Sequence, residues 1–448
     1  MDPIIEKKLA FVLEYAKKKG ATKSEVLFHD NAKFSLKSND GELEQYSIAN
    51  SQVWGIRVVK DRKIGLSYSE SLEENALTEM VDQALNFTKY SAVDEFQDIS
   101  IVHADKIISD SAQVYRQDET SLAEKIDFAL SLEAAPKKLD SAVVGSPYNG
   151  YSDIISKNYI ANSEGTICFE KQKVFSCFTS ALIEKDGKSA MNWHGNNART
   201  FAELGLDDVV NTSYNLASEL LNGEQIKTGH YDIIFSQDQL ATLLNIFATL
   251  FSGKKAMDGR NPYRDKLGEK IAHQSLTIKD IPLYTAGLGY QLFDSEGCLG
   301  QEIALIDRGL LNEFYHNSET ANYFKCKNNG HASRTARSAL KIASSNLVIS
   351  LGATSHNELY GGTVLEILET GGVHSGADPI SGDFSFAGAG YLWKNGKKIH
   401  PVKGVTVSGN FYQMLKNMAG IGDKLYPDIA KRLFAPIIRW SDLTIGGS

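Results

Sequence analysis

The sequence is poor in cysteine and has no long apolar run. Its 448 residues contain four cysteines, no two of them at CxxC spacing, so we expect reduced thiols and not a disulfide framework: Cys168, Cys177, Cys298 and Cys326. No uninterrupted apolar stretch is long enough to span a bilayer. The N-terminal residues mix acidic and basic side chains and lack an apolar block before a cleavage site, which argues against a secretion signal. We therefore expect a cytoplasmic protein with no membrane partner.

A surplus of positive charge is also missing. The chain carries 47 Lys and Arg against 55 Asp and Glu, a net charge of −8, so no basic field would attract a phosphate backbone and nucleic acid is not an expected ligand. Hydrophobic residues make up 42% and charged residues 23%, values typical of soluble folded proteins. The length fits two or three domains.

Several motifs of nucleotide-binding proteins and hydrolases are incomplete. Gly187-Lys188-Ser189 has the end of a P-loop, but Leu182 stands where the required earlier glycine should be. Gly287-Leu288-Gly289 and Gly388-Ala389-Gly390 both lack the third glycine of a dinucleotide fingerprint. The chain has no GxSxG pentapeptide. These segments indicate hairpin turns and close strand packing.

The histidines do not have the spacing of a zinc protease helix. Such a helix presents two histidines about one turn apart with an adjacent glutamate. None of the ten histidines is followed by glutamate, and no two lie within a helical turn of each other: His29, His103, His194, His230, His273, His316, His331, His356, His374 and His400. A metal site built from residues distant in the sequence remains an open alternative.

The N-terminal residues predict one helix followed by strands. Asp2-Pro3 and Gly20 bracket an amphipathic helix with an acidic N-cap and a closing glycine. The strands that follow are expected at Ser24–His29, Lys33–Ser38, Gln52–Val59 and Lys63–Tyr68. Lys60-Asp61-Arg62 is expected to join the last two as a hairpin.

Two further helices are predicted by capping boxes. Ser71 with Glu74, and Ser121 with Glu124, each place a glutamate three residues after a serine and before apolar residues in helical register. Between Ser141 and Trp193 the pattern is all-β, and a helix is expected over Leu206–Leu221.

The polar break Asn222-Gly223-Glu224 is taken as a domain boundary. It divides an N-terminal half, residues 1–223, with antiparallel strands and flanking helices, from a C-terminal half, residues 224–448. The C-terminal half is expected to begin with a strand over Tyr231–Phe235 and a helix over Gln239–Phe251, followed by a β-rich, strongly bent, barrel-like region. Runs of strands without regular βαβ alternation predict an α+β fold.

A glycine-rich segment, Gly376–Gly404, has two interpretations. Asn395-Gly396 favours a tight hairpin turn. Before it, glycines alternate with residues such as Phe384, and glycines within strands mark bends or the close approach of another backbone. That backbone could be a peptide substrate added as an extended strand. Alternatively, the glycines only allow a barrel-like sheet to curl and pack.

If the segment binds a peptide substrate, it contains several candidate residues for that binding. They are Gly376, Asp378, Asp383, Phe384 and His374, although turn-forming aspartates and a hydrogen-bonded loop histidine are the more frequent explanation. Charged side chains occur in two further segments. Phe293–Gly297 predicts a tight turn with two carboxylates, and Arg334 and Arg337 are candidates for binding a carboxylate of a substrate or partner.

Several segments together carry a family resemblance. They are SGKKAMDGRNPYRDKLGEKI (252–271), FDSEGCLGQEIALIDRGLLNEFYHNSETANYF (293–324), GHASR (330–334), GADPISGDFSFAGAGYLWKNGKKIHPVKG (376–404), VTVSGNFYQMLKNMAGIGDKL (405–425) and the ending WSDLTIGGS. The chain resembles the TldD/PmbA family, named modulators of DNA gyrase, in order and over nearly its whole length.

The resemblance implies an intracellular heterodimeric peptidase in which the TldD-type subunit carries a zinc motif, HExxxH, and a C-terminal cysteine. Here the motif positions fall on Asn245, Ile246 and Leu250, and the tail LFAPIIRWSDLTIGGS has no cysteine. The chain therefore resembles the PmbA (TldE) type, with no cofactor of its own and with zinc expected in the partner. It would form part of a chamber for proteolysis of unfolded or leader peptides, and would associate with itself if the partner were absent.

Two other functions remain open. One is an independent homodimeric hydrolase with a metal site built from distant residues. The other is a peptide-binding protein without catalysis.

Overall fold

The computed structural model describes residues 1–99, 107–109 and 113–448, so His103 lies outside the described residues. The elements of the N-terminal half are α1 (Pro3–Lys18), β1 (Lys23–Asn39), β2 (Glu42–Lys60), β3 (Lys63–Ser69), α2 (Glu74–Phe87), β4 (Ile107–Ser109), α3 (Leu122–Leu139), β5 (Val143–Gly145), β6 (Gly150–Asn162), β7 (Ile167–Lys185), β8 (Lys188–Ala198), the 3₁₀ helix η1 (Phe201–Leu204) and α4 (Leu206–Leu220).

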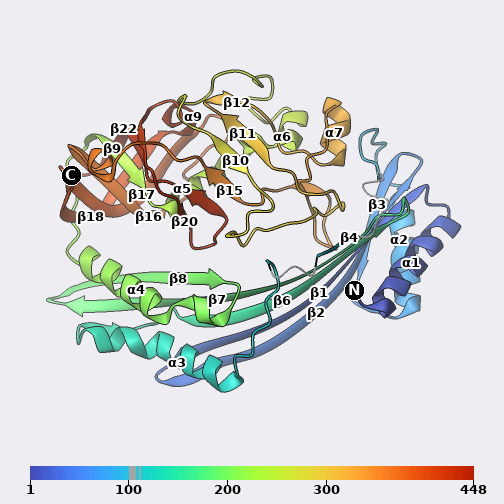
Figure 1. Cartoon of the computed structure of the whole chain (residues 1–448), viewed down its shortest axis with the longest axis horizontal. Helices are drawn as coiled ribbons and strands as arrows, with labels where there is room; N and C mark the ends of the chain where they lie inside the picture. Colours follow the sequence, from blue (N-terminus) through green and yellow to red (C-terminus); the bar gives the residue numbers. More distant parts are fainter. Residues whose placement is uncertain (100–106, 110–112) are drawn as a thin grey trace.

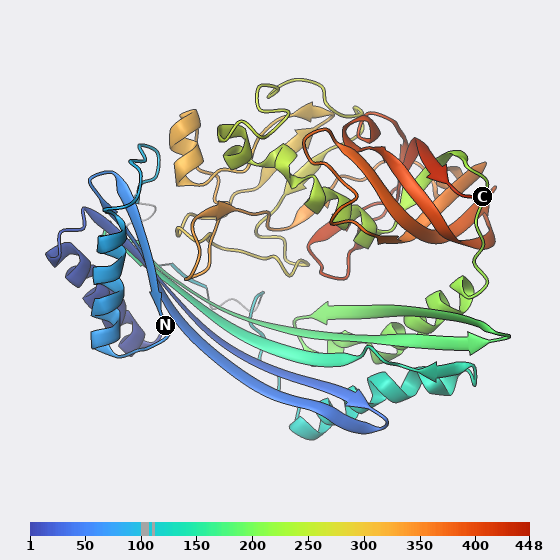
Figure 2. The same ribbon diagram turned by 180° about the vertical axis from the view of Figure 1, so that it is seen from behind.

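These strands form one curled sheet of eight strands. The order is β3-β2-β1-β6-β7-β4, with β5 and β8 also paired to β7. The long strands curve together into an open half-barrel, and the C-terminal half of the chain lies over its concave face (Figure 1). Helices α1 and α2 pack at one end of the sheet, and α3 and α4 at the other (Figure 2).

The alternation of side chains along β1 explains why this strand is buried on both faces. Val26 and Phe28 pack with the residues of α1 and α2. Leu27 points to the opposite face, where it packs with Phe293 of the C-terminal half. Successive residues of a strand point to opposite faces, so a strand covered on both sides has a continuous apolar run.

Two predicted strands prove to be one. The segments Ser24–His29 and Lys33–Ser38 were expected to be separate, but both belong to the continuous strand β1. The polar residues between them stay in the sheet because they have partners on both sides; Asn31, for example, pairs with Ser51 of β2 and Ser156 of β6. The predicted hairpin between β2 and β3 is confirmed.

The helix caps confirm two predictions and correct a third. The side chain of Asp2 accepts a hydrogen bond from the Ile4 amide at the start of α1. Ser121 and Glu124 form the complete capping box of α3. The box expected at Ser71 is absent, because α2 begins after Glu73, whose side chain makes no capping bond. The Ser71 hydroxyl accepts instead from the Glu73 amide, in a turn before the helix.

The C-terminal half contains β9 (Gly229–Phe235), α5 (Gln237–Ile246), the 3₁₀ helix η2 (Ala248–Phe251), α6 (Gly253–Met257), β10 (Ile278–Asp280), β11 (Ile303–Asp307), β12 (Leu310–Leu311), α7 (Ser318–Phe324), β13 (Ala332–Ser333), β14 (Lys341–Ile342), β15 (Leu347–Ile349), α8 (His356–Leu359), β16 (Thr363–Gly371), β17 (Asp383–Lys394), β18 (Lys397–Asn410), α9 (Phe411–Met414), β19 (Met418–Ile421), β20 (Tyr426–Pro427), β21 (Leu433–Ala435) and β22 (Ile438–Gly446).

Five of these strands close into a barrel. The order β18-β17-β16-β9-β22 is completed by pairing of β22 back to β18. A second sheet has the order β12-β11-β10-β15-β21-β20. The prediction of an α+β fold with a barrel-like C-terminal region is confirmed, whereas the domain boundary at residue 223 stays a prediction.

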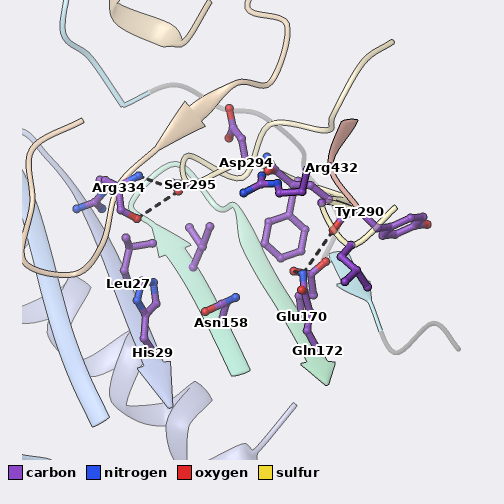
Figure 3. A pocket seen from close by; sticks show the side chains of 15 residues that line it. Leu27, His29, Asn158, Glu170, Gln172, Tyr290, Asp294, Ser295, Arg334 and Arg432 are labelled. Carbon is purple, nitrogen blue, oxygen red and sulfur yellow. Dashed lines mark hydrogen bonds between the residues drawn. The ribbon is translucent and has the colours of Figure 1, made fainter. Parts of the chain in front are cut away.

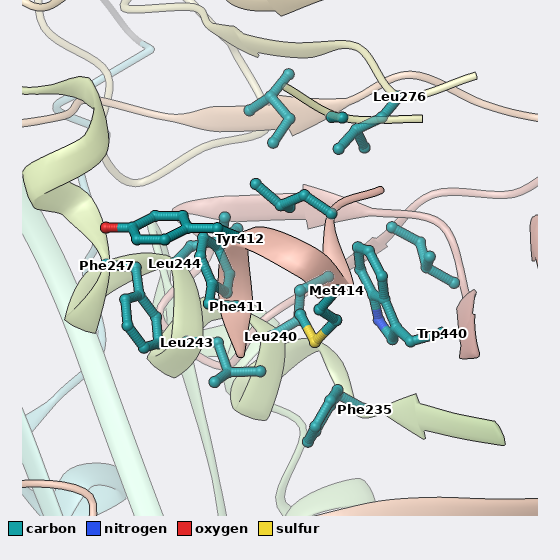
Figure 4. Packing of buried hydrophobic residues seen from close by; sticks show 14 of the residues in the cluster. Phe235, Leu240, Leu243, Leu244, Phe247, Leu276, Phe411, Tyr412, Met414 and Trp440 are labelled. Carbon is teal, nitrogen blue, oxygen red and sulfur yellow. The ribbon is translucent and has the colours of Figure 1, made fainter. Parts of the chain in front are cut away.

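The main core of the C-terminal half joins the barrel, α5 and the second sheet. Phe247, fully buried, stacks on Phe411 with ring centroids 4.5 Å apart, and Leu240, Leu243 and Leu244 of α5 lie in the same cluster (Figure 4). Aromatic and branched side chains at this density provide most of the apolar burial that stabilises such a fold.

The four cysteines are free, and three of them, all except Cys326, are buried. Burial raises the pKa of each buried thiol to about 12. None of the helices within the described residues is long and apolar enough to cross a membrane.

Candidate functional site

The helix expected to carry a zinc motif ends earlier than predicted. Instead of one helix over Gln239–Phe251, α5 ends at Ile246 and the chain tightens into the 3₁₀ helix η2 after Phe247. Asn245 is exposed on the last turn of α5, Ile246 is half-buried, and Leu250 lies on η2 with no exposed surface. The three motif positions are therefore split between two helical segments, and one of them points into the core.

A cavity of about 500 Å³ lies beside the end of α5. Asn245 and Ile246 line it, and its apolar wall includes Leu244, Phe251 and Leu433. Its polar groups come from other elements: Ser252, Lys255, Tyr315, Asp428 and Arg432. The cavity is thus amphipathic, with apolar walls and two cationic side chains.

The acidic and phenolic groups around this cavity are held by the protein itself. The Tyr315 hydroxyl donates to the fully buried carboxylate of Asp280 at 2.8 Å, and burial together with that carboxylate raises the pKa of Tyr315 well above its ordinary value. Asp428 accepts hydrogen bonds from the backbone amides of Arg432 and Leu433. These groups are therefore already committed to stabilising the fold.

Two buried histidines lie close to Tyr315: His331, whose ring centroid is 4.6 Å from that of Tyr315, and His316, the next residue in the chain. The Nδ1 atom of His331 lies 3.0 Å from the side-chain oxygen of Asn329, and the Nδ1 atom of His316 is 3.1 Å from the hydroxyl of Thr320. Burial and the neighbouring His331 lower the pKa of His316 to about 4, so this imidazole is neutral at physiological pH. Their partners mark these histidines as parts of the buried hydrogen-bond network.

The residues at the motif positions do not fit a zinc ion. Zinc in proteins is held by thiolate, imidazole and carboxylate groups. Asn245, Ile246 and Leu250 supply an amide and two aliphatic side chains, and an aliphatic group at the position of the glutamate cannot accept a proton from water. Within residues 1–99, 107–109 and 113–448, no three His, Cys, Asp or Glu side chains gather in a set that could hold a metal.

The glycine-rich segment approaches another backbone, and that backbone belongs to this chain. Gly376 accepts a hydrogen bond from the Ser385 amide, and a Cβ atom at Gly376 would lie 2.3 Å from the Ser385 carbonyl oxygen. Further along, a Cβ atom at Gly390 would lie 1.8 Å from the carbonyl oxygen of Glu366 on β16. Glycine is required at both positions, because a side chain would overlap a backbone carbonyl oxygen.

The other residues proposed to bind substrate occupy different surroundings. Phe384 is buried in the barrel core, 6.4 Å from Phe247 between ring centroids. Asp378 accepts from the Ile380 amide in a turn, and Asp383 accepts from the Asn410 side chain, which lowers the Asp383 pKa. His374 is exposed. These contacts favour the structural interpretation, and substrate binding by these five residues stays a prediction.

The two arginines considered for carboxylate binding have carboxylate partners within the chain. Arg334 is buried and donates to Glu25 of β1 at 2.6 Å, and exposed Arg337 pairs with Glu70. Glu25 also lies 3.4 Å from Arg57. Arg57 in turn donates to Glu296 of the C-terminal half at 2.8 Å.

This buried network, Glu25, Arg57, Glu296 and Arg334, joins the two halves. The predicted turn at Phe293–Gly297 supplies Glu296, and its Asp294 accepts from the amides of Glu296, Cys298 and Ala332. Burial and the charge of Glu296 raise the Asp294 pKa to about 8. The two carboxylates of this turn therefore serve its structure, as the turn interpretation predicted.

Three family models match successive parts of the chain. They describe the PmbA/TldA metallopeptidase domain 1 over residues 24–86, its central domain over residues 115–221 and its C-terminal domain over residues 228–447. The chain belongs to the PmbA/TldD family. The glycine-rich segment and the positions Asn245, Ile246 and Leu250 all lie in the part matched by the C-terminal model.

Relatives and solved structures of this family span nearly the whole chain. A metalloprotease PmbA homolog of Haemophilus influenzae is 23% identical over 420 residues, 93% of this chain and 91% of the relative. A metalloprotease of Methanothermobacter thermautotrophicus is 26% identical over 397 residues, 87% of this chain and 85% of the relative.

Two crystal structures have the same fold. A Thermotoga maritima protein classed with the modulators of DNA gyrase is 26% identical with a TM-score of 0.86, and the match covers 99% of this chain and 100% of that one. TldE from Thermococcus kodakarensis is 19% identical with a TM-score of 0.82, and the match covers 99% and 100% of the two chains. At 19% identity, the match to the Thermococcus kodakarensis protein shows a shared fold.

Sequence reasoning missed the cationic side of the cavity beside α5. Lys255 lies in the quoted segment SGKKAMDGRNPYRDKLGEKI, but Arg432 lies 177 residues further along the chain, so no local pattern joins them. The capping serine of α6, Ser252, was the available local signal, because it fixes the start of the helix that carries Lys255.

Proposed function

We propose that this PmbA/TldD-family protein is the zinc-free subunit of a heterodimeric metallopeptidase, and that it forms part of the chamber in which a TldD-type partner cleaves unfolded or leader peptides. The observation that carries the proposal is the set Asn245, Ile246 and Leu250 at the zinc-motif positions. The family relationship and the relatives named metalloproteases support the link to proteolysis.

The cavity beside α5 supports a role in holding polypeptide. Its apolar walls would accommodate side chains, while Lys255 and Arg432 would face peptide carbonyl or carboxylate groups. The chain would thus bind and orient a substrate, and the partner would supply the zinc ion and the activated water.

The test is to purify the tagged chain from its own host, to identify co-purifying proteins by mass spectrometry and to quantify zinc in the same fraction. We expect an HExxxH paralogue at equal stoichiometry with about one zinc ion per pair. Asn245→Ala serves as the matched control, because a zinc ion held by the partner would not depend on this side chain. A chain that elutes alone and metal-free would favour a peptide-binding protein, and one that elutes alone with stoichiometric metal would favour an independent hydrolase.

A second test restores the motif. The variant Asn245→His, Ile246→Glu, Leu250→His should show no zinc-dependent peptidase activity, because residue 250 lies in the core on a separate helical segment and supporting groups around a zinc ion are lacking. The double variant Asn245→His, Ile246→Glu leaves Leu250 in place and should fold normally, also without activity. Zinc-dependent turnover by either variant alone would contradict this explanation for the absence of zinc chemistry in the chain.

A further inference from the structure

A second cavity, of about 300 Å³, lies where the C-terminal half covers the concave face of the half-barrel. Strands β1, β6 and β7 form its floor, and the segment from Leu288 to Ser295, with Arg334 and Arg432, forms its roof (Figure 3). It is distinct from the cavity beside α5, although Arg432 borders both. None of the polar residues on its floor belongs to the site described above.

The floor carries a row of three polar side chains, one from each strand. His29 of β1 pairs in register with Asn158 of β6, and Asn158 pairs with Glu170 of β7. Residues directly opposite one another on neighbouring strands point to the same face with Cβ atoms roughly 5 Å apart. The row therefore presents an imidazole, an amide and a carboxyl group side by side to the cavity.

Glu170 has an unused acceptor. The residue is 4% exposed, its Oε2 atom accepts from the Gln172 side chain at 2.5 Å, and its buried Oε1 atom has no hydrogen-bond partner within the described residues. Burial raises the pKa of Glu170. A buried carboxylate oxygen without a donor is costly, and a bound cation or N–H donor would offset that cost.

The guanidinium of Arg199 acts on Glu170 but does not occupy that acceptor. It lowers the Glu170 pKa to some extent, yet its own hydrogen bonds go to three backbone carbonyls, those of Val114, Lys173 and Leu288. The backbone N–H of Leu292 also favours the charged form of Glu170, but the Oε1 atom has no hydrogen-bond partner within the described residues and can accept from a ligand.

The roof supplies an anion-binding group. Arg432 is exposed, and its side chain donates to the backbone carbonyls of Ser344 and Ser345. Within the described part of the chain it forms no ion pair, whereas Arg334, which also lines the cavity, is paired with Glu25. Arg432 is therefore the guanidinium of this cavity that is available to a carboxylate.

His29 and Asn158 extend the polar row away from Glu170 and have unused hydrogen-bonding capacity. Neither side chain bonds to another group among the described residues. Burial and the positive charge of Arg334 lower the His29 pKa to about 4, so the imidazole offers one donor and one acceptor at neutral pH. Such a row complements amide and hydroxyl groups.

We propose that this cavity binds a small zwitterion of the α-amino-acid class, with its ammonium group at Glu170 and its carboxylate at Arg432. The ligand is a free amino acid or a short peptide, and its remaining polar groups face Asn158 and His29. The proposal does not rest on the peptidase assignment, because all of the groups belong to this chain.

The test is isothermal titration of the purified chain with each of the twenty standard L-amino acids and with L-alanyl-L-alanine. We expect saturable binding of at least one of these probes, and loss of that binding when its amino group is acetylated or its carboxylate is amidated. Preference for a free amino acid or for the dipeptide identifies the source of the ligand. The absence of binding by every probe at millimolar concentration overturns the proposal.

Three variants make the test specific. Glu170→Gln keeps the shape of the side chain, and Arg432→Gln changes an exposed residue, so both should fold; each should weaken binding about tenfold, the effect of losing one charge-assisted hydrogen bond. Glu184→Gln, on the exposed end of β7 and outside the cavity, is the matched control and should leave binding unchanged. Binding that survives Glu170→Gln undiminished would also overturn the proposal.

Discussion

The open half-barrel and the closed barrel differ in how the inner face of the sheet is covered. The barrel pairs β22 with both β9 and β18, so its interior is filled by its own side chains and those of α5 and α9. The half-barrel remains open, and separate apolar clusters form under its two helical pairs. Its concave face is covered by the other half of the molecule. Closure thus produces a continuous core, whereas the open sheet leaves room for a polar cavity and a buried ionic network.

The largest expected effect is in the core that the closed barrel shares with α5. Phe247→Ala should lower the free energy of unfolding by about 3 to 5 kcal/mol, because it leaves a cavity beside Phe411 in a tightly packed cluster. Phe178→Ala, on the open sheet where the side chain is 40% exposed, should cost about 1 kcal/mol or less. Urea unfolding of both variants measures the difference, and equal losses would contradict the contrast between the two regions.

The ionic network should come next. Arg57→Met leaves buried Glu296 and Glu25 without one of their partners and should cost about 3 kcal/mol. The loss is at the lower end for a buried pair because Glu25 keeps Arg334 and Glu296 keeps hydrogen bonds from Ser318.

Arg337→Ala is the matched control for this network. It breaks an exposed ion pair with Glu70 and should cost less than about 1 kcal/mol. Both variants are measured by denaturant unfolding at low and high salt. An Arg57→Met protein as stable as the control would show that the network does not hold the halves together.

The cavity between the halves should make stability depend on pH. The folded state keeps His29 neutral, with a pKa of about 4 against an ordinary 6.5, so between these values the unfolded chain binds more protons. Stability contributed by neutral His29 is therefore lost as the pH falls from about 6.5 to about 4. His29→Gln should reduce the slope of stability against pH in this window by up to about 1.4 kcal/mol per pH unit.

The control for this measurement is His230→Gln, which changes an exposed histidine paired with exposed Asp442. Its stability curve between pH 4 and 7 should follow that of the unmodified protein. Thermal or urea unfolding across this range, with all three proteins, tests the sign: a slope unaffected by His29→Gln would place the acid sensitivity elsewhere.

The smallest effects distinguish a true helix cap from a false one. Ser121→Ala removes half of a capping box and should cost about 1 kcal/mol. Ser71→Ala affects a turn before α2 and should cost only a few tenths of that amount. Equal losses would mean that the turn at Ser71 contributes as much as a cap.

These differences also show what the sequence could predict. The Asp2 cap, the Ser121 box and the hairpin between β2 and β3 depend on residues within a few positions of one another, so local patterns indicated them. The break expected near Asn31 was wrong because strand continuity there depends on partners in β2 and β6.

Contacts between distant segments could not be predicted from local patterns. The polar row on the cavity floor depends on the register of three strands, and His29 of β1 lies more than a hundred residues before Asn158 of β6 and Glu170 of β7. The pairing of Arg334 with Glu25 spans 309 positions. Among the substrate-binding candidates, Phe384 illustrates the same difficulty: its alternation correctly placed it in a strand, but only the closed barrel determines that it faces the core.

The pairing of β22 with its two neighbours in the barrel, β9 and β18, has a consequence for biosynthesis. Strand β9 is synthesised more than two hundred residues before β22. Until β22 is made, the edges of β9 and β18 that pair with it lack their hydrogen-bond partner. During translation the eight-stranded sheet can assemble while four barrel strands still present an open edge. Exposed strand edges recruit other chains. The nascent protein is therefore exposed to aggregation through these edges until β22 has left the ribosome.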